Sequence, residues 1–434
     1  MVAALSLVGL AACSDDSSSS DGGGGGDSTE ATSGGDSSGD SGSTAEGVTN
    51  ILLWHGYTEA DGDVVQKIID NFNASQSQYH VTAEQMAWSS IIEKLVTSLG
   101  SGDGPNAMVY GPDVALGYIN QGAFISQQDY YDDTTTYKNQ FAVYENLIDQ
   151  VTWNGEIYGA PMGTAPYSVY YNTDLWAAAG LTDADIPTTI PELMEVAKKM
   201  TVDENGDGTP ETYGFAIPDT SDNSIQLSTW LHSGGGDFIT DGVAYLDSPE
   251  NIATLEMLQK AVVEDKISPT GIDSTAAMEL FGAGRAGMIF NGPWEITSAQ
   301  SFGIPCSVFG WPGTWTAGVA NYWWSTSMND TPEEKAALYA FEDFWNSYEQ
   351  QVIWTESYYP PNRGDIPQEE MAYEIIGTLS QYSEYAHFYM SGSAASLPDI
   401  AAEVDTLVSS AFKGGDVPSL LATAQEKITG YLNG

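Results

Sequence analysis

From Val48 onward, short apolar runs alternate with segments whose apolar residues recur with the period of a helix. The runs have the length and the β-branched and aromatic content of strands, and the periodic segments are typical of amphipathic helices. Strands are predicted at 48–54, 79–86 and 106–111, and helices at 63–75, 89–102 and 112–125. This order of elements predicts an α/β fold with a mostly parallel sheet that helices cover on both faces.

A second block of the same kind follows the first. Strands are predicted at 156–162, 167–172 and 213–218, and helices at 190–201, 224–233, 249–263 and 275–283. The last part of the chain, roughly 332–434, is helical in pattern, with 332–354 as its longest element. Because a single core stops growing at roughly 250–300 residues, this chain of 434 residues predicts at least two cores.

The first 12 residues, MVAALSLVGLAA, are apolar but too few to span a bilayer, which takes about 20. They predict a signal peptide over residues 1–12. Leu10-Ala11-Ala12-Cys13 resembles the lipobox of bacterial lipoproteins, which implies that Cys13 becomes a lipid-modified N-terminus. No basic residue precedes Lys67, so the usual charged start of such a signal is missing. An ordinary cleaved signal with an incidental cysteine is the alternative.

Residues 14–47 are rich in Gly, Ser and Asp and contain no aromatic or large aliphatic side chain. Such a segment cannot bury enough apolar surface to repay the entropy of ordering. Residues 13–47 are therefore predicted to be a lipidated cysteine with a disordered tether. Together with the signal peptide, they predict an extracytoplasmic protein that is lipid-anchored to the outer face of a bacterial cell membrane.

The chain carries 60 acidic and 12 basic residues, a formal charge of −48. This charge repels phosphate backbones and anionic headgroups, so nucleic acid is not expected as a partner. It favours a soluble monomer and suits a neutral or cationic ligand better than an anionic one.

Four stretches carry a resemblance to a known family. They are NGEIYGAPMG (154–163), YSVYYNTDLWAAAGL (167–181), LFGAGRAGMIFNGPWEI (280–296) and YYPPNRGDIP (358–367). In their order and spacing the chain resembles the extracytoplasmic sugar-binding lipoproteins of ABC transporters, the family of maltose- and oligosaccharide-binding proteins. The resemblance implies two α/β lobes with a ligand cleft between them, closure on an oligosaccharide, and delivery of it to the permease subunits of an importer.

The resemblance also implies where the chain crosses between the lobes. Crossings are expected near Tyr158–Tyr167 and Met288–Gly292, with a third near 345–360. The first lobe would then combine 48–158 with about 292–345, and the second would combine 159–291 with about 346–434.

Sugar recognition requires flat aromatic rings for C–H faces and polar groups for hydroxyls. The candidate platforms are Trp54, Tyr57, Trp88, Trp230, Trp294, Trp323 and Trp324, and the candidate polar contacts are His55, Ser89, Asp113, Asp237, Glu295 and Arg363. Several of them follow the first three strands, whose carboxyl ends meet at one sheet edge where ligands bind. Trp294 is the strongest, because the Gly292-Pro293 turn and the resemblance both place it at the cleft. Core packing is the alternative for each aromatic residue, and Trp323 and Trp324 cannot both face a ligand if they lie in one strand.

A calcium loop is a further candidate. Asp203, Asn205, Asp207, Thr209 and Glu211 alternate through DENGDGTPE, in the manner of a calcium-binding loop with Gly208 at its turn. The glutamate that completes such loops is absent, since Gly214 stands there. A plain Asx- and Gly-rich turn is the alternative, and any calcium here would be structural. No other cofactor is expected.

Two other functions remain open at this stage. A secreted glycoside hydrolase would need a pair of carboxylates, and the sequence marks none; it also contains no nucleophile elbow, HExxH motif or Walker loop. A binding protein for a peptide, a polyamine or a metal would show a cleft rich in carboxylates. The sequence therefore favours a solute-binding protein without enzymatic activity.

Overall fold

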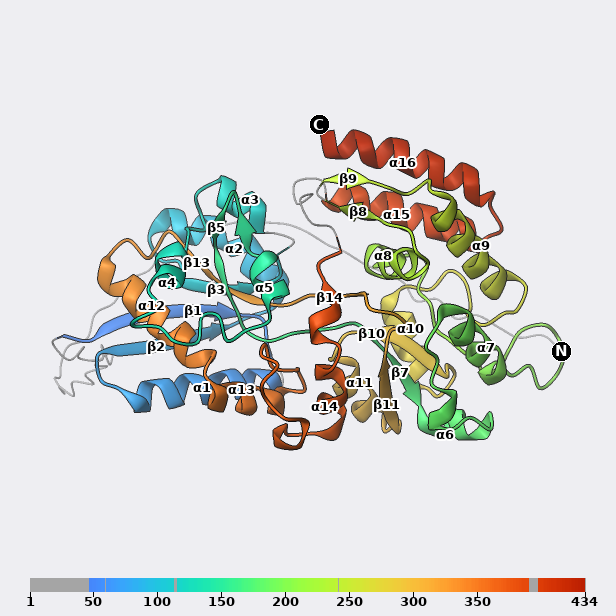
Figure 1. Ribbon diagram of the computed structural model, residues 1–434, viewed down its shortest axis with the longest axis horizontal. Coiled ribbons are helices and arrows are strands. Elements are labelled where there is room, and N and C mark those ends of the chain that lie inside the picture. Colours follow the sequence, from blue (N-terminus) through green and yellow to red (C-terminus); the bar gives the residue numbers. More distant parts are fainter. Residues whose placement is uncertain (1–46, 59, 113–114, 241, 390–396, 434) are drawn as a thin grey trace, which may run out of the picture. The chain divides into compact units, whose positions relative to one another are not determined.

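The computed structural model describes residues 47–433, apart from 59, 113–114, 241 and 390–396. The compact unit Glu46–Gly434 contains two main sheets and the helices that cover them (Figure 1). The predicted signal peptide, Cys13 and the tether up to residue 46 lie outside the described residues. Among the helices that are described, none combines the length and the apolar content that crossing a bilayer demands.

The first sheet has five strands in the order β2-β1-β3-β13-β6. Their bounds are β1 (Thr49–His55), β2 (Tyr79–Gln85), β3 (Ala107–Tyr110), β6 (Gly159–Pro161) and β13 (Tyr322–Ser325). β1 pairs in parallel with β2 and β3, whereas β13 runs antiparallel to both of its neighbours, β3 and β6. The predicted parallel pairing therefore holds for β2-β1-β3, whereas the pairs that β13 makes with β3 and β6 are antiparallel and the sheet is mixed.

Helices cover both faces of the first sheet. One face packs against α1 (Ala60–Ser75), α12 (Pro332–Trp345) and α13 (Tyr348–Trp354), and the other against α2 (Trp88–Ser101) and α3 (Ala115–Asn120). α12 begins with a capping box between Thr331 and Glu334 and with Pro332 in its first turn. The prediction of a single helix over 332–354 is wrong, because α12 ends at Trp345 and α13 begins at Tyr348. The helix predicted at 112–125 ends early, since Gly122 takes a φ of +72°.

The second sheet has three strands in the order β10-β7-β11. β7 (Ser168–Asn172) is central and runs antiparallel to both β10 (Met288–Asn291) and β11 (Cys306–Gly310). The prediction of a mostly parallel sheet is therefore wrong for these three strands. The strand predicted at 213–218 forms only isolated parallel bridges, from Tyr213 to Ala286 and from Ala216 to Ile289.

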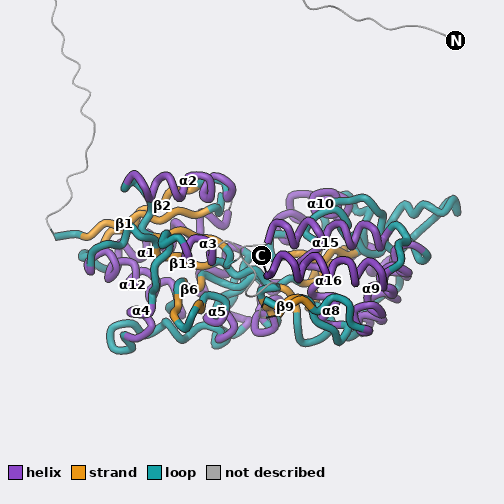
Figure 2. Tube along the Cα trace, turned by 90° about the horizontal axis from the view of Figure 1, so that it is seen from above, coloured by secondary structure: helices purple, strands orange, loops and turns teal. Residues whose placement is uncertain are grey.

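The helices of the second group enclose this sheet. They are α6 (Thr173–Ala178), α7 (Ile190–Met200), α8 (Asn223–Ser233), α9 (Pro249–Val263), α10 (Ser274–Gly282), α11 (Glu295–Phe302), α14 (Glu374–Ser380), α15 (Leu397–Phe412) and α16 (Val417–Asn433). α15 and α16 lie side by side and share one apolar core with α8 and α9 (Figure 2). The helical pattern of the C-terminal region is thus explained by packing of α12 and α13 on the first sheet and of α15 and α16 on α8 and α9.

The remaining elements are short. They are α4 (Gln128–Asp132), α5 (Glu145–Asp149), β4 (Thr152–Trp153), β5 (Glu156–Ile157), β8 (Ile239–Thr240), β9 (Val243–Ala244), β12 (Thr316–Ala317), β14 (Ala386–His387) and 3₁₀ turns at Asp183–Asp185, Thr355–Ser357, Gln368–Glu370 and Ser383–Tyr385.

The chain passes between the sheets at 162–167, from β6 to β7, which agrees with the crossing expected at Tyr158–Tyr167. The crossing expected at Met288–Gly292 is wrong, because β10 is fully paired in the second sheet. That passage occurs instead at 311–321, between β11 and β13. Two segments also differ from the expected lobes: β11 belongs to the second sheet, and Trp354 packs in the core of the first.

Candidate ligand-binding site

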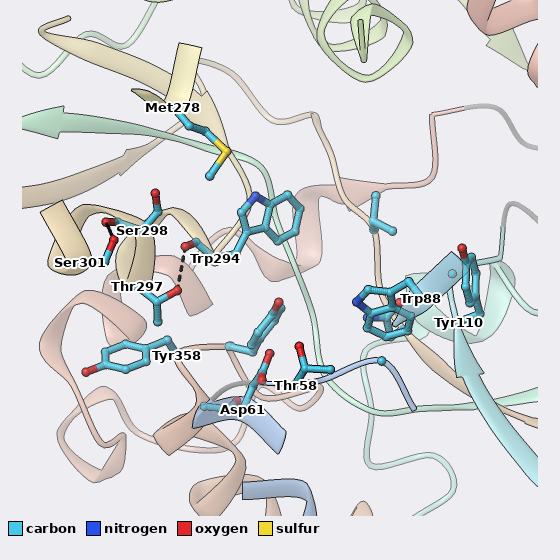
Figure 3. A pocket seen from close by; sticks show the side chains of 16 residues that line it. Thr58, Asp61, Trp88, Tyr110, Met278, Trp294, Thr297, Ser298, Ser301 and Tyr358 are labelled. Carbon is cyan, nitrogen blue, oxygen red and sulfur yellow. Dashed lines mark hydrogen bonds between the residues drawn. The ribbon is translucent and has the colours of Figure 1, made fainter. Parts of the chain in front are cut away.

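A pocket of about 670 Å³ lies where side chains from both sheet regions meet. Figure 3 shows Trp88 and Tyr110 on one side of it and Met278 and Trp294 on the other. Its lining residues are Gly56, Thr58, Asp61, Trp88, Tyr110, Gly111, Met278, Trp294, Thr297, Ser298, Ser301, Val319, Asn321, Ser357, Tyr358 and Tyr359. The lining is thus aromatic and hydroxyl-rich, with few charged groups.

The first wall is built at the carboxyl ends of β1, β2 and β3, where an α/β sheet places its ligands. Trp88 follows β2 and meets the rings of Tyr57 and Tyr110 edge to face, with ring centroids 5.2 and 5.6 Å apart. Gly56 lies against this indole, since a Cβ at Gly56 would come within 2.1 Å of Trp88 Cδ2. The residue after β1 must therefore be a glycine for Trp88 to keep its place.

The second wall is the start of α11. Trp294 packs edge to face against Tyr167, with centroids 5.5 Å apart, and its carbonyl accepts a hydrogen bond from Thr297 Oγ1 at 2.9 Å (Figure 3). The next residues on this face, Ser298 and Ser301, also line the pocket. A Cβ at Gly292 would lie 2.2 Å from Cη2 of Trp294, so this tryptophan too needs a glycine beside it.

The third wall comes from connecting segments, and its residues were not among the candidates predicted from the sequence. Asn321, just before β13, donates from Nδ2 to the hydroxyl of Tyr57 at 2.7 Å. Tyr358 and Tyr359 follow the 3₁₀ turn Thr355–Ser357 and both line the pocket. The signal that could have found the tyrosines was the YYPP sequence in one of the four resembling stretches, because paired aromatics beside two prolines fit a rigid, exposed turn.

A second pocket of about 310 Å³ shares Met278 and Trp294 with the first. It is lined by Tyr167, Asn291 and residues of α8 and α10. Gln226, one of these, is buried and its Oε1 has no partner. Trp294 thus has open space on more than one side.

Of the predicted platforms, Trp88 and Trp294 line the main pocket, and Tyr57 lies directly behind Trp88. The expectation for Trp54, Trp230, Trp323 and Trp324 is corrected: all four are buried in apolar clusters and line neither pocket. They lie inside strands or a helix whose faces are covered, so their side chains point into cores. Trp323 and Trp324 do point to opposite faces, and Trp324 Nε1 donates to the carbonyl of Tyr110 at 2.9 Å.

Most of the predicted polar contacts do not reach the pocket either. His55 is buried, and burial lowers its pKa to about 4. Asp237 accepts from Phe238 N at 2.7 Å and Thr240 Oγ1 at 2.8 Å, which fixes its own loop. Arg363 pairs with both oxygens of Asp365 at 2.6 Å and donates to the carbonyl of Asn346 at 2.8 Å. The hydrogen bonds of Asp237 and Arg363 are thus made within the protein, and His55 is enclosed in the core.

Three further predicted residues complete the comparison. Ser89 is exposed in the first turn of α2 and lines neither pocket, and Asp113 lies outside the described residues. Glu295 is fully buried beside Trp294, where Oε2 accepts from Asn291 Nδ2 at 2.7 Å and Oε1 has no partner. Burial raises the pKa of this carboxyl to about 7. Its predicted contact with ligand is corrected, since Glu295 lines neither pocket.

The predicted calcium loop is a turn whose oxygens accept backbone N–H groups. Asp203 accepts from Gly206 N at 2.8 Å and Gly208 N at 2.9 Å, and Asp207 accepts from Thr209 N at 2.8 Å. Glu211 accepts from Asn205 Nδ2 at 2.6 Å. In the described part of the chain, no three acidic, His or Cys side chains are grouped as metal ligands. These bonds favour the alternative of a plain Asx- and Gly-rich turn, which a calcium titration tests.

Comparison with known proteins identifies the family to which this architecture belongs. The family described as bacterial extracellular solute-binding protein matches residues 67–374. The chain is 23% identical over 321 residues to a Brucella abortus protein named only as a binding protein, covering 71% of this chain and 74% of that one. It is 24% identical over 264 residues to the maltotriose-binding protein of Pyrococcus abyssi, covering 60% and 53%.

Among solved structures, the cyclic α-maltosyl-1,6-maltose binding protein of Arthrobacter globiformis superimposes with a TM-score of 0.74 at 19% identity. The match covers 89% of this chain and 100% of that one. The fold is therefore that of the two-lobe binding proteins. Because the family match spans well over half of the chain, the protein belongs to the bacterial extracellular solute-binding protein family.

Proposed function

We propose that this protein captures an oligosaccharide in the main pocket and delivers it to the permease of an ABC importer. The observation that carries the proposal is the position of Trp88 and Trp294 on opposite walls of one pocket, with hydroxyl and amide side chains between them. Indole rings stack on the C–H faces of sugars, and the Thr297, Ser298 and Asn321 side chains suit their hydroxyls. A pocket of about 670 Å³ has room for several sugar rings.

The charge of the pocket supports a neutral ligand. Asp61 is the one charged side chain among the described residues that line it. A polyamine, metal or basic peptide requires several carboxylates to compensate its charge. The relatives point the same way, since two of them are named for binding maltotriose and a cyclic maltosyl-maltose.

The single charged side chain in the pocket lining also favours binding without hydrolysis. Glycoside hydrolases use two carboxyl groups about 5–10 Å apart across the scissile bond. The described pocket lining supplies one, Asp61, while Glu295 is buried and does not line the pocket. The ligand would be released chemically unchanged when the two lobes open.

The family and the N-terminal sequence support a proposed location. Members of this family act outside the cytoplasm, and the Leu10-Ala11-Ala12-Cys13 sequence supports lipid anchoring at Cys13. We propose a monomer tethered to the outer face of the bacterial membrane. Mass spectrometry of the protein purified from bacterial membranes should find a diacylated Cys13, and Cys13→Ser should release the protein from the membrane fraction.

The binding proposal is tested with a panel of linear and cyclic α-gluco-oligosaccharides and mannotriose. Tryptophan fluorescence should change in a saturable manner with at least one of them, and chromatography should recover that saccharide intact. Cleavage products would contradict the proposal in favour of a hydrolase. Binding of spermidine or a peptide, with no saccharide bound, would contradict the sugar assignment.

A further inference from the structure

Tyr358 and Tyr359 are consecutive residues that pack into different cores and line the same pocket. Tyr359 packs against the cluster under the first sheet, which contains Trp354 and the apolar face of α1. Tyr358 packs against the cluster beside the second sheet, which contains Tyr170 and Ile289. The boundary between the two cores therefore falls between two neighbouring aromatic side chains at the pocket.

The backbone of Tyr358 makes this arrangement possible. Its φ of 67° and ψ of 13° are left-handed, at the end of the 3₁₀ turn Thr355–Ser357. It is one of four non-glycine residues with positive φ in the described part of the chain. Glycine or asparagine is the usual residue in this conformation, and a tyrosine costs stability there. A strained residue that lines a pocket is a candidate for function, because the strain persists only where the surroundings enforce it.

Two side chains hold the ring of Tyr358 in place. Tyr373, which is 38% exposed, stacks on it in parallel with centroids 4.2 Å apart and an angle of 5°. Gln300 Nε2 donates to the hydroxyl of Tyr358 at 3.3 Å. Gln300 belongs to α11, the helix that begins directly after Trp294 and supplies the serines of the second wall. Tyr358 thus links the connecting segment to that wall.

We propose that Tyr358 is a further aromatic contact for the saccharide, and that Tyr373 is the positioning residue that holds it. The proposal rests on the proposed function, since a sugar is the ligand whose C–H face would use a third aromatic ring beside Trp88 and Trp294. Tyr373 covers one face of the Tyr358 ring, so the ligand meets its other face or its edge. The left-handed backbone at this position would suit glycine. Keeping an aromatic ring there therefore lowers the stability of the protein.

The test compares ligand affinity with thermal stability in the full-length protein. Tyr358→Asn and Tyr358→Gly remove the ring but suit the left-handed backbone. We expect each to weaken binding of the preferred panel saccharide by about tenfold or more, while the melting temperature stays the same or rises. Tyr373→Ala should weaken binding by a smaller factor, mainly through faster dissociation, and Tyr373→Phe should restore it. Tyr245→Ala, at an exposed tyrosine outside the pocket, is the matched control.

The outcomes separate this proposal from the proposed function. If the wild type binds a panel saccharide and the Tyr358 variants bind it equally well, only the role of Tyr358 is overturned. If these variants lose stability in proportion to affinity, or if Tyr373→Phe fails to restore binding, the two tyrosines are merely structural and the proposal is also overturned. If the wild type binds no saccharide, the proposed function fails first and this proposal fails with it.

Discussion

Gly292 and Trp294 are in contact across the turn that begins α11: a Cβ at Gly292 would lie 2.2 Å from Cη2 of the indole. Gly56 has the same relationship to Trp88 on the opposite wall, at 2.1 Å from Cδ2. Contacts under 3 Å to a rigid ring cannot be relieved by a small adjustment, so each glycine fixes the place of one tryptophan.

The first prediction concerns this contact. Gly292→Ala should displace Trp294 and weaken saccharide binding by about tenfold, or about 1.4 kcal/mol, measured by isothermal titration calorimetry. Gly430→Ala is the control, because its added Cβ meets nothing within 4 Å and alanine favours helix α16. Equal affinities for both variants and the wild type would show that the position of the Trp294 indole does not depend on Gly292.

The second prediction concerns Glu295. Its pKa is about 7 in the folded protein, against an ordinary value of 4.5, so folding favours the protonated form. The associated stability is fully present below pH 4.5 and is lost as the pH rises through 7. Glu295→Gln stays neutral, so its free energy of unfolding should exceed that of the wild type by up to about 3 kcal/mol at about pH 8. The two proteins should have similar stability near pH 4.5.

Urea denaturation at several pH values measures this difference. A difference between Glu295→Gln and the wild type that is the same in acid and in base would contradict the raised pKa of this buried carboxyl. Glu250→Gln, at an exposed position in α9, should show no such pH dependence.

The third prediction concerns Tyr57 and Asn321. Tyr57→Phe removes the acceptor of the 2.7 Å hydrogen bond from Asn321 Nδ2. The loss should lower the free energy of unfolding by about 1 kcal/mol and should weaken saccharide binding, because Asn321 lines the pocket. Equilibrium urea unfolding and calorimetric titration report the two effects separately. Tyr245→Phe, exposed and outside the pocket, should change neither.

The fourth prediction concerns the turn at 203–211. Because Asp203 and Asp207 already accept backbone N–H groups, the turn needs no ion to satisfy them. Millimolar calcium or a chelator should leave the melting temperature unchanged, while Asp203→Ala should lower the free energy of unfolding by about 1 kcal/mol. A calcium-dependent rise in melting temperature that disappears in Asp207→Ala would establish the calcium loop instead.

Sequence reasoning located the part of the site that follows regular elements. Trp88 begins α2 shortly after β2 ends, Trp294 comes directly after a Gly-Pro turn, and both line the pocket. It failed for tryptophans within elements, such as Trp54 and Trp323, because a strand buried on both faces offers no exposed side for a ligand. Tyr358 and Asn321 were missed since they lie in connecting segments, where no periodicity indicates the direction of a side chain.

The strand directions in the second sheet also could not be predicted from the sequence. All four residues of β10 and all five of β7 are buried, so their apolar runs look alike whether the strands pair in parallel or antiparallel. The run AGMIF was therefore compatible with a strand that crosses between lobes, although β10 is paired along its whole length with β7.

The central claim is that Trp294 binds an oligosaccharide in the main pocket. Calorimetric titration of the wild type, Trp294→Ala and Trp153→Ala with the panel saccharide that binds the wild type most tightly tests it most directly. Trp153 is partly buried like Trp294 but lies outside the pocket, so it controls for loss of an indole. We predict saturable binding to the wild type and Trp153→Ala, and affinity at least about tenfold weaker for Trp294→Ala. No saccharide binding by the wild type, or equal affinity in all three proteins, would contradict the claim.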